Sequence, residues 1–177
     1  MIMPRGHQQL LLPAHPGFIW SSLALAFAMN MLVNMGLFGR ASGVPDVLAL
    51  VLAFWVIHQP QRIGVGIAFT LGLAMDVHQS SLLGQHALTY TALSFLALGI
   101  HRRLLWFGAL AQMAQLLPLF VAAHALSLLV NLLAGGEFPG AWLLLAPLLE
   151  TLLWPAVNAL LLMPQRRAPD PDANRPL

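Results

Sequence analysis

The sequence contains few charged residues and lacks two residue types altogether. None of its 177 residues is cysteine, which excludes disulfides, zinc–thiolate sites and thiol chemistry. Lysine is also absent, so all eight basic residues are arginines. Charged residues make up 8% of the chain and hydrophobic residues 59%, a balance that leaves too little charge for the surface of a soluble domain. The composition therefore predicts a protein that folds in a membrane.

Long apolar runs fill most of the chain. A helix that crosses the ~30 Å hydrocarbon core of a bilayer needs ~20 apolar residues. We expect a single all-α domain over residues 1–163 with six transmembrane helices, followed by a disordered cytoplasmic tail over 164–177. The predicted spans are residues 18–38, 44–57, 63–77, 82–100, 104–134 and 141–163.

Three of these runs depart from the ideal length. At ~1.5 Å per residue, the runs 44–57 and 63–77 extend only about 21 and 22 Å. They are either two short spans in a locally thinned bilayer or one re-entrant hairpin, and both readings leave Asp46 and Asp76 on the same side. The run 104–134 is too long, and we expect it to tilt or kink at Pro118, which lacks a backbone donor.

The arginines predict the orientation. Cytoplasmic loops of membrane proteins carry an excess of basic residues. Six spans with both termini in the cytoplasm place one arginine, Arg40, outside. The arginines on the cytoplasmic side are then Arg5, Arg62, Arg102, Arg103, Arg166, Arg167 and Arg175.

The run 63–77 carries a row of small residues at steps of four that ends in a carboxylate: Gly64, Ala68, Gly72 and Asp76. Small residues at this spacing let another helix approach closely. The row packs either inside this protein's own bundle or against the transmembrane helix of a partner. In the second case Gly64, Gly72 and Asp76 carry the partner interface.

Polar residues gather in the half of the predicted bundle that faces outward. Asp46 follows Pro45 at the start of a run, where a carboxylate suits the positive end of a helix. We expect an outer polar cluster that either lines a crevice or caps and joins helices. Its members are Asn34, Asp46, Gln85, His86 and Tyr90.

Glu150 lies near the middle of the last span, where a carboxylate is costly and needs a partner. The last two spans should form an antiparallel hairpin around Glu137, and His124 and Glu150 lie equally far from that residue. We therefore expect Glu150 to pair with His124, or to be held neutral. A buried structural pair is favoured over a proton relay.

Catalytic patterns are missing. The chain has no HExxH, no GxSxG and no phosphate-binding glycine loop with lysine, so we expect neither an enzyme nor a cofactor. A metal site built from Asp46, Asp76, His78 and His86 has no recognisable ligand spacing, and we expect no metal.

The region from Pro45 to Tyr90 resembles the signature region of the MreD family of bacterial rod shape-determining membrane proteins. The residues that carry the resemblance are Pro45-Asp46, Trp55, Pro60, Arg62, Gly64, Gly72-Leu73, Asp76, Ser81-Leu82-Leu83-Gly84-Gln85-His86-Ala87-Leu88 and Tyr90. They cover about a quarter of the chain, and the remainder matches only as apolar spans.

This resemblance implies a non-enzymatic protein of the bacterial inner membrane that belongs to the cell-elongation complex. Such proteins bind MreC and work with MreB, a SEDS glycosyltransferase and a penicillin-binding transpeptidase in side-wall peptidoglycan synthesis. The family fold is considered similar to the S components of vitamin transporters. The alternative function is therefore an S-component-like subunit that binds a vitamin for uptake.

Overall fold

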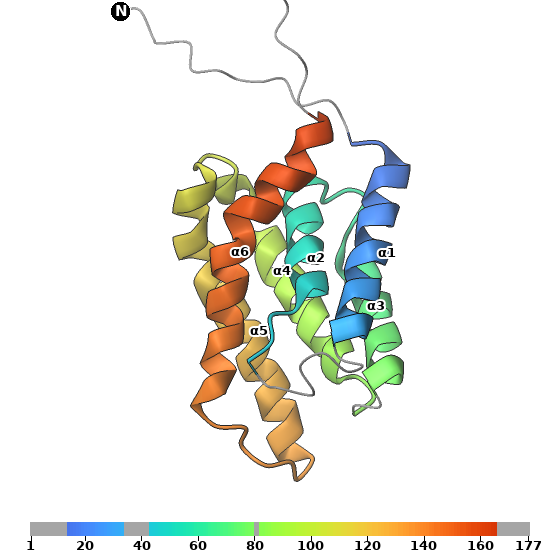
Figure 1. Cartoon of the computed structure of the whole chain (residues 1–177), viewed down its shortest axis with the longest axis vertical. Helices are drawn as coiled ribbons and strands as arrows, with labels where there is room; N and C mark the ends of the chain where they lie inside the picture. The colour runs from blue at the N-terminus through green and yellow to red at the C-terminus, as the bar shows by residue number, and fades with distance from the viewer. Residues whose placement is uncertain (1–13, 34–42, 80–81, 166–177) are drawn as a thin grey trace, which may run out of the picture.

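A computed structural model describes residues 14–33, 43–79 and 82–165 of the chain. In these residues the secondary structure is helical throughout, without strands, which confirms the predicted all-α fold. The α-helices run alternately down and up the bundle (Figure 1). The elements are α1 Pro16–Leu32, α2 Val47–His58, α3 Val65–Gln79, α4 Gln85–Leu104, α5 Ala109–Leu133, η2 Ala141–Leu144, α6 Leu145–Leu162 and η3 Met163–Gln165.

Some helices begin or end outside the predicted runs, at residues that favour a helix end. α1 begins at Pro16, before the apolar run, because proline suits the first helical turn and the His15 ring accepts a hydrogen bond from Gly17. α4 continues beyond Ile100 and carries Arg102 and Arg103 in its last turn, where cations are favourable.

Two features of the C-terminal half concern the predicted runs. α5 is one helix of 25 residues that contains Pro118, and the tilt or kink expected there stays a prediction. η3 extends the helical part of the chain to Gln165, two residues into the predicted tail, and the buried Gln165 side chain donates to the Leu161 carbonyl at 2.8 Å. Residues 166–177, the rest of that predicted tail, lie outside the described part of the chain.

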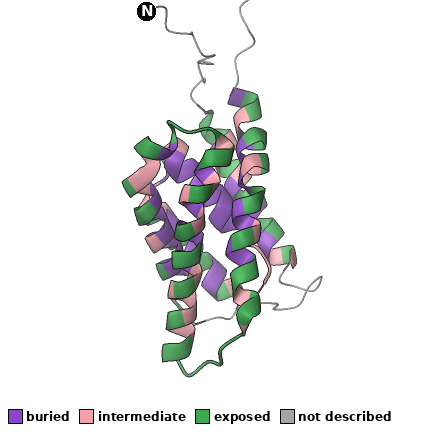
Figure 2. Cartoon of the chain, turned by 90° about the vertical axis from the view of Figure 1, so that its left-hand side faces the viewer, coloured by how far each residue is buried: buried purple, intermediate pink, exposed green. Residues whose placement is uncertain are grey.

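α2 occupies the centre of the bundle. All of its residues from Leu48 to Ile57 are buried, and Figure 2 shows buried segments concentrated in the middle of the molecule. A helix that is apolar all round belongs in a core. α2 begins part-way along the bundle (Figure 1), after the non-helical residues 43–46. Its first N–H groups therefore lie inside the protein and need acceptors there.

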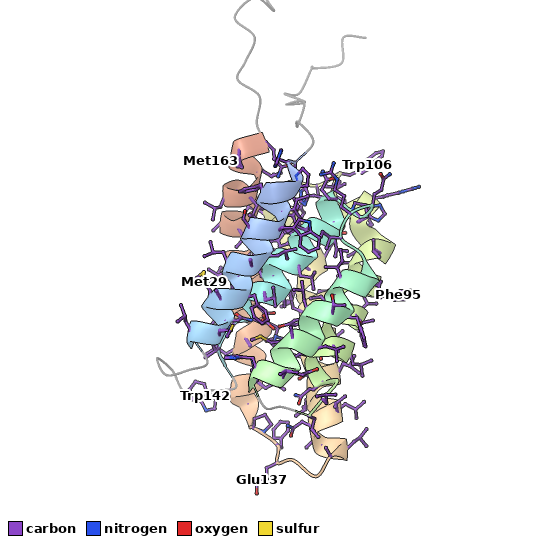
Figure 3. All side chains as sticks on the ribbon, turned by 90° about the vertical axis from the view of Figure 1, so that its right-hand side faces the viewer. Met29, Phe95, Trp106, Glu137, Trp142 and Met163 are labelled. Carbon is purple, nitrogen blue, oxygen red and sulfur yellow. The ribbon has the colours of Figure 1, made fainter. Side chains whose placement is uncertain are left out.

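The outer surface of the bundle is apolar, whereas several polar side chains are buried. Met29 and Phe95 point away from the helices in Figure 3 and are 44% and 69% exposed. Asp76 and Glu150, by contrast, are buried. A fold of this kind suits lipid better than water as its surroundings. Two segments, Ala109–Leu133 and Ala141–Gln165, are long and apolar enough to cross a membrane.

The two ends of the bundle differ in their residues. Trp106 and Met163 lie at one end, and Glu137 and Trp142 lie at the other (Figure 3). The turns that follow α2 and α4 lie at the end where α1 begins (Figure 1). There the Arg62 guanidinium donates to the Ala14 carbonyl at 2.9 Å. The arginines that we expected on one side of the membrane, as far as they are described, share this end.

Candidate functional site

Asp46 is the N-cap of α2 and the centre of a buried polar network. Its Oδ1 accepts a hydrogen bond from the Ala49 backbone at 2.9 Å, the geometry of an N-terminal cap. Its Oδ2 accepts a bond of 2.6 Å from the hydroxyl of Tyr90, a fully buried residue of α4. The carboxylate therefore joins the start of α2 to the middle of the bundle.

Side chains from two more helices complete this cap. Asn30 of α1 donates to Asp46 Oδ1 at 2.6 Å and accepts from the Val47 backbone at 3.0 Å. Glu150 of α6 accepts from the Asp46 backbone at 2.8 Å. Three backbone N–H groups at the start of α2 thus have side-chain acceptors, which lets a helix begin inside an apolar bundle.

Glu150 also brings α5 into the network. Its Oε1 lies 2.9 Å from His124 Nε2, so the structure places together the two residues that sequence geometry paired. The Glu150 side chain is 1% exposed and that of His124 is 22% exposed. We expected this pair to be separate from Asp46 and Tyr90. The structure instead joins all four residues in one network. This network, Asn30, Asp46, Tyr90, His124 and Glu150, is called the capping network below.

Asp76 forms a second polar centre in the last turn of α3. It accepts hydrogen bonds from the backbones of Gly84, His86 and Ala87 at 2.8, 2.7 and 3.2 Å. The His86 ring adds a contact of 2.8 Å. The carboxylate of α3 thus caps α4, while Gly84 turns the chain with a φ of 103° that suits glycine.

Two members of the row of small residues, Gly72 and Asp76, lie against this protein's own α4. Ala68 and Asp76 are 0% and 1% exposed, and Gly72 is also buried. A Cβ on Gly72 would overlap the backbone of Ala87. Only Gly64 is open, since a Cβ there would meet no atom within 4 Å. Ala68, Gly72 and Asp76 are thus covered within the chain, and of the interface expected for a partner only Gly64 remains accessible.

The expected outer polar cluster is divided among three places. Asp46 and Tyr90 belong to the capping network, and His86 contacts Asp76. Gln85 donates to the Ser127 hydroxyl of α5 at 2.8 Å. Asn34, the remaining member, lies outside the described residues.

Sequence reasoning missed several buried contacts. Gln112 of α5 accepts a 2.8 Å bond from the Trp154 indole of α6 and donates to the carbonyls of Leu104 and Phe107. The available signal was a glutamine in a long apolar run, which also contains Gln115. Trp55 is buried and donates to the Ser22 hydroxyl at 2.8 Å.

The chemistry that the described residues support is structural. Within residues 14–33, 43–79 and 82–165, no three or more His, Asp or Glu residues are grouped so that they could hold a metal ion. The carboxylates of Asp46 and Asp76 accept hydrogen bonds from helix starts and neighbouring side chains. These contacts fix the positions of helices.

Comparison with known proteins decides the family. The sequence pattern of the family described as rod shape-determining protein MreD matches residues 14–164. The chain belongs to the MreD family. The resemblance seen between Pro45 and Tyr90 is therefore confirmed. A curated MreD relative, the rod shape-determining protein MreD of Haemophilus influenzae, is 33% identical over 122 residues, which cover 66% of this chain and 72% of the relative.

MreD proteins are membrane proteins of the machinery that determines rod shape, and they are not a known enzyme family. No solved structure matches this chain. The similarity to S components of vitamin transporters consequently remains a prediction of the resemblance.

Proposed function

We propose that this MreD protein is a non-enzymatic scaffold in the bacterial inner membrane. It binds MreC directly and helps to organise side-wall peptidoglycan synthesis together with MreB, a SEDS glycosyltransferase and a penicillin-binding transpeptidase. Membership of the MreD family is the observation that carries this proposal.

The capping network supports a scaffold role. It joins α1, α2, α4, α5 and α6 through hydrogen bonds of 2.6 to 3.0 Å. Such a network in a low-dielectric interior favours one arrangement of the helices, because a misplaced helix leaves buried polar groups without partners. A rigid bundle can hold the membrane helix of a partner in a fixed position.

We further propose that all six helices span the membrane, with both termini in the cytoplasm. The alternating helix directions support this topology, and so does the position of the Arg62 turn at the end where α1 begins (Figure 1). Reporter fusions after Arg62 and after Arg103 should both report a cytoplasmic location. Signals from opposite sides of the membrane would contradict the topology.

Short helices remain compatible with a span in this arrangement. α2 has 12 residues and α3 has 15, about 18 and 22 Å of helix. The non-helical residues 43–46 lie against the start of α2, where side chains supply the acceptors that lipid lacks. We retain two short spans over a re-entrant hairpin.

Affinity purification from native membranes tests the scaffold role. The tagged chain should co-purify MreC at a constant ratio. Gly64→Leu should reduce that yield if the exposed end of the small-residue row contacts the partner. Gly66→Leu, two residues further along in the first turn of α3, is the matched control, since a Cβ there also meets no atom within 4 Å. Failure of the unaltered chain to retain MreC would overturn the proposal.

The vitamin-binding alternative requires polar groups that face an outward pocket. The polar residues described in the outer half instead bond to one another, as in the Tyr90–Asp46, His86–Asp76 and Gln85–Ser127 contacts. No observation favours that alternative over the scaffold.

A further inference from the structure

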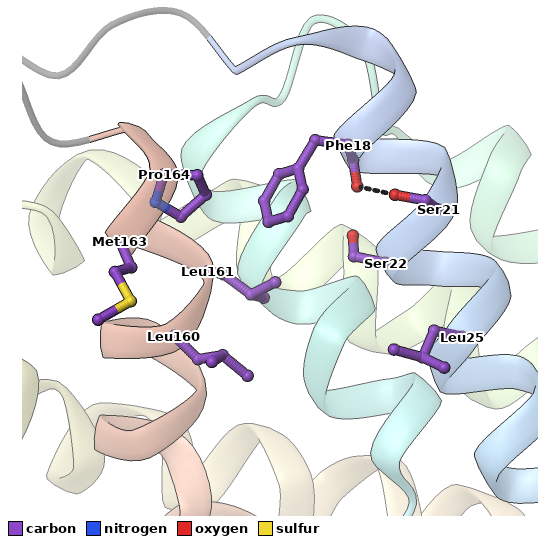
Figure 4. A pocket seen from close by; sticks show the side chains of 8 residues that line it. All are labelled: Phe18, Ser21, Ser22, Leu25, Leu160, Leu161, Met163 and Pro164. Carbon is purple, nitrogen blue, oxygen red and sulfur yellow. Dashed lines mark hydrogen bonds between the residues drawn. The ribbon is translucent and has the colours of Figure 1, made fainter.

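A groove lies between α1 and α6 at the end of the bundle where α1 begins and α6 ends (Figures 1 and 4). Its volume is about 610 Å³, within the range of ligand sites. The side chains that line it come from α1 and from the last turns of the chain's C-terminal helices. They are Phe18, Ser21, Ser22, Leu25, Leu160, Leu161, Met163 and Pro164.

The walls of this groove are almost entirely apolar. Ser21 donates to the Phe18 carbonyl at 3.1 Å. Ser22 donates to the Ile19 carbonyl at 2.8 Å and accepts from the Trp55 indole. Both hydroxyls are thus used within the protein, and a polar ligand would find no matching groups here. The occupant of the walls must itself be apolar.

The Arg62 guanidinium lies at the start of α1, the helix that supplies one wall of the groove, and this end is called the mouth of the groove. Ala14 precedes Phe18 by about one helical turn, and its carbonyl accepts the Arg62 guanidinium. Among the described residues this is the one hydrogen bond of the Arg62 guanidinium, which has five N–H donors. The exposed His15 lies beside it. Four N–H donors of Arg62 therefore remain for an anionic group at the mouth.

No described carboxylate lies at this mouth to neutralise the guanidinium. Glu137 is at the opposite end of the bundle (Figure 3). Asp76 lies in the last turn of α3, toward that same far end, and Glu150 lies about three helical turns before Leu161 on α6. The charge that would complement the mouth is therefore negative and must come from outside the described chain.

We propose that the groove binds an anionic phospholipid, with one acyl chain between α1 and α6 and the phosphate at Arg62. An apolar channel that ends at a cation matches the two parts of such a lipid, and basic pockets between membrane helices recognise anionic headgroups. The inference rests on the proposed span of the membrane by α1 and α6. It does not depend on MreC.

The apolar part is tested by filling the groove. Leu160 points into the groove in Figure 4 and is 67% exposed, so Leu160→Trp adds bulk there without burying it in the core. Leu152, an α6 residue that does not line the groove, is 65% exposed, and Leu152→Trp is the matched control. The full-length protein in mild detergent is titrated with dioleoyl phosphatidylglycerol and analysed by native mass spectrometry. Leu160→Trp should bind about tenfold less lipid. A loss of this size is expected if the indole displaces just under two methylene groups of the acyl chain from the groove.

The charged part is tested with a second lipid. Dioleoyl phosphatidylcholine has the same acyl chains and no net charge. The unaltered protein should prefer phosphatidylglycerol about fivefold, the equivalent of one arginine. Arg62→Gln should abolish this preference. Arg103→Gln, which removes an exposed cation at the end of α4, should leave it intact.

Two results would overturn the inference. Equal lipid binding by Leu160→Trp and Leu152→Trp would show that the groove does not hold the acyl chain. Equal binding of both lipids by the unaltered protein would remove the headgroup site. If Leu160→Trp instead loses MreC but keeps its lipid, the groove is a docking site for a protein helix, and the lipid proposal is wrong while the scaffold role stands.

Discussion

The backbone N–H of Asp46 donates a 2.8 Å hydrogen bond to Oε1 of Glu150, which lies 104 residues further along the chain. The carboxylate of α6 thereby caps a helix that begins inside the bundle. One oxygen of Glu150 also lies against His124, and the other, Oε2, is buried without a hydrogen-bond partner among the described residues. The stability of the fold should therefore depend on this side chain.

Glu150→Ala should destabilise the bundle more than Glu150→Gln. Alanine removes the acceptor of both the Asp46 backbone and His124, whereas the glutamine carbonyl can keep both bonds. We expect a difference of about 2 kcal/mol between the two variants, because a buried donor without a partner is costly. Thermal unfolding in detergent measures it. Equal midpoints for the two variants would show that the capping role is wrong.

Tyr90→Phe should lower the free energy of unfolding by about 1–2 kcal/mol. The change removes only the hydroxyl that donates to Asp46 at 2.6 Å and leaves the buried ring in place. Thr70→Val is the control, since the Thr70 hydroxyl is exposed and bonds only to its own helix. The prediction fails if both variants unfold at the temperature of the unaltered protein.

Gly72→Ala should separate α3 from α4 and cost about 1–3 kcal/mol, the usual effect of overpacking. The added methyl group would overlap the backbone of Ala87, which cannot rotate away as a side chain can. Gly64→Ala, at the residue just before α3, meets no atom within 4 Å and should be neutral. Unfolding midpoints of the two variants test the packing, and a harmless Gly72→Ala would contradict it.

Asp76→Ala should loosen the start of α4 and cost up to about 2 kcal/mol, the upper range for loss of an N-terminal cap. Hydrogen exchange of the Gly84, His86 and Ala87 amides should accelerate, because these three groups lose their acceptor. Glu137→Ala removes an exposed carboxylate in the loop after α5 and should leave the exchange unchanged. Unaltered protection of these amides in Asp76→Ala would refute the cap.

Much of this architecture could be predicted because lipid imposes simple requirements. The apolar runs locate the helices to within a few residues, since a chain in lipid must satisfy its backbone groups internally. Small residues spaced four positions apart indicated close helix packing around Gly72. Equal spacing about Glu137 placed His124 and Glu150 at the same depth, and their side chains lie 2.9 Å apart.

Other features could not be predicted because they depend on helices that are distant in sequence. The row from Ala68 to Asp76 offered two possible neighbours, and only packing against α4 distinguishes them. The outer polar residues seemed to form one cluster, yet Asp76 and Asp46 each take different partners. The apolar surroundings of these polar residues show that each needs a hydrogen-bond partner, but they do not show which residue the partner is.

By itself, the sequence determined that this protein is a helical bundle of the MreD family with a membrane-compatible surface, because apolar length and residue spacing are local properties. The tertiary structure alone decided that α2 begins inside the bundle and that Asn30, Tyr90 and Glu150 converge on its cap. Helix-end N–H groups must find acceptors in three dimensions, and only the packed arrangement brings α1, α4 and α6 to the same point.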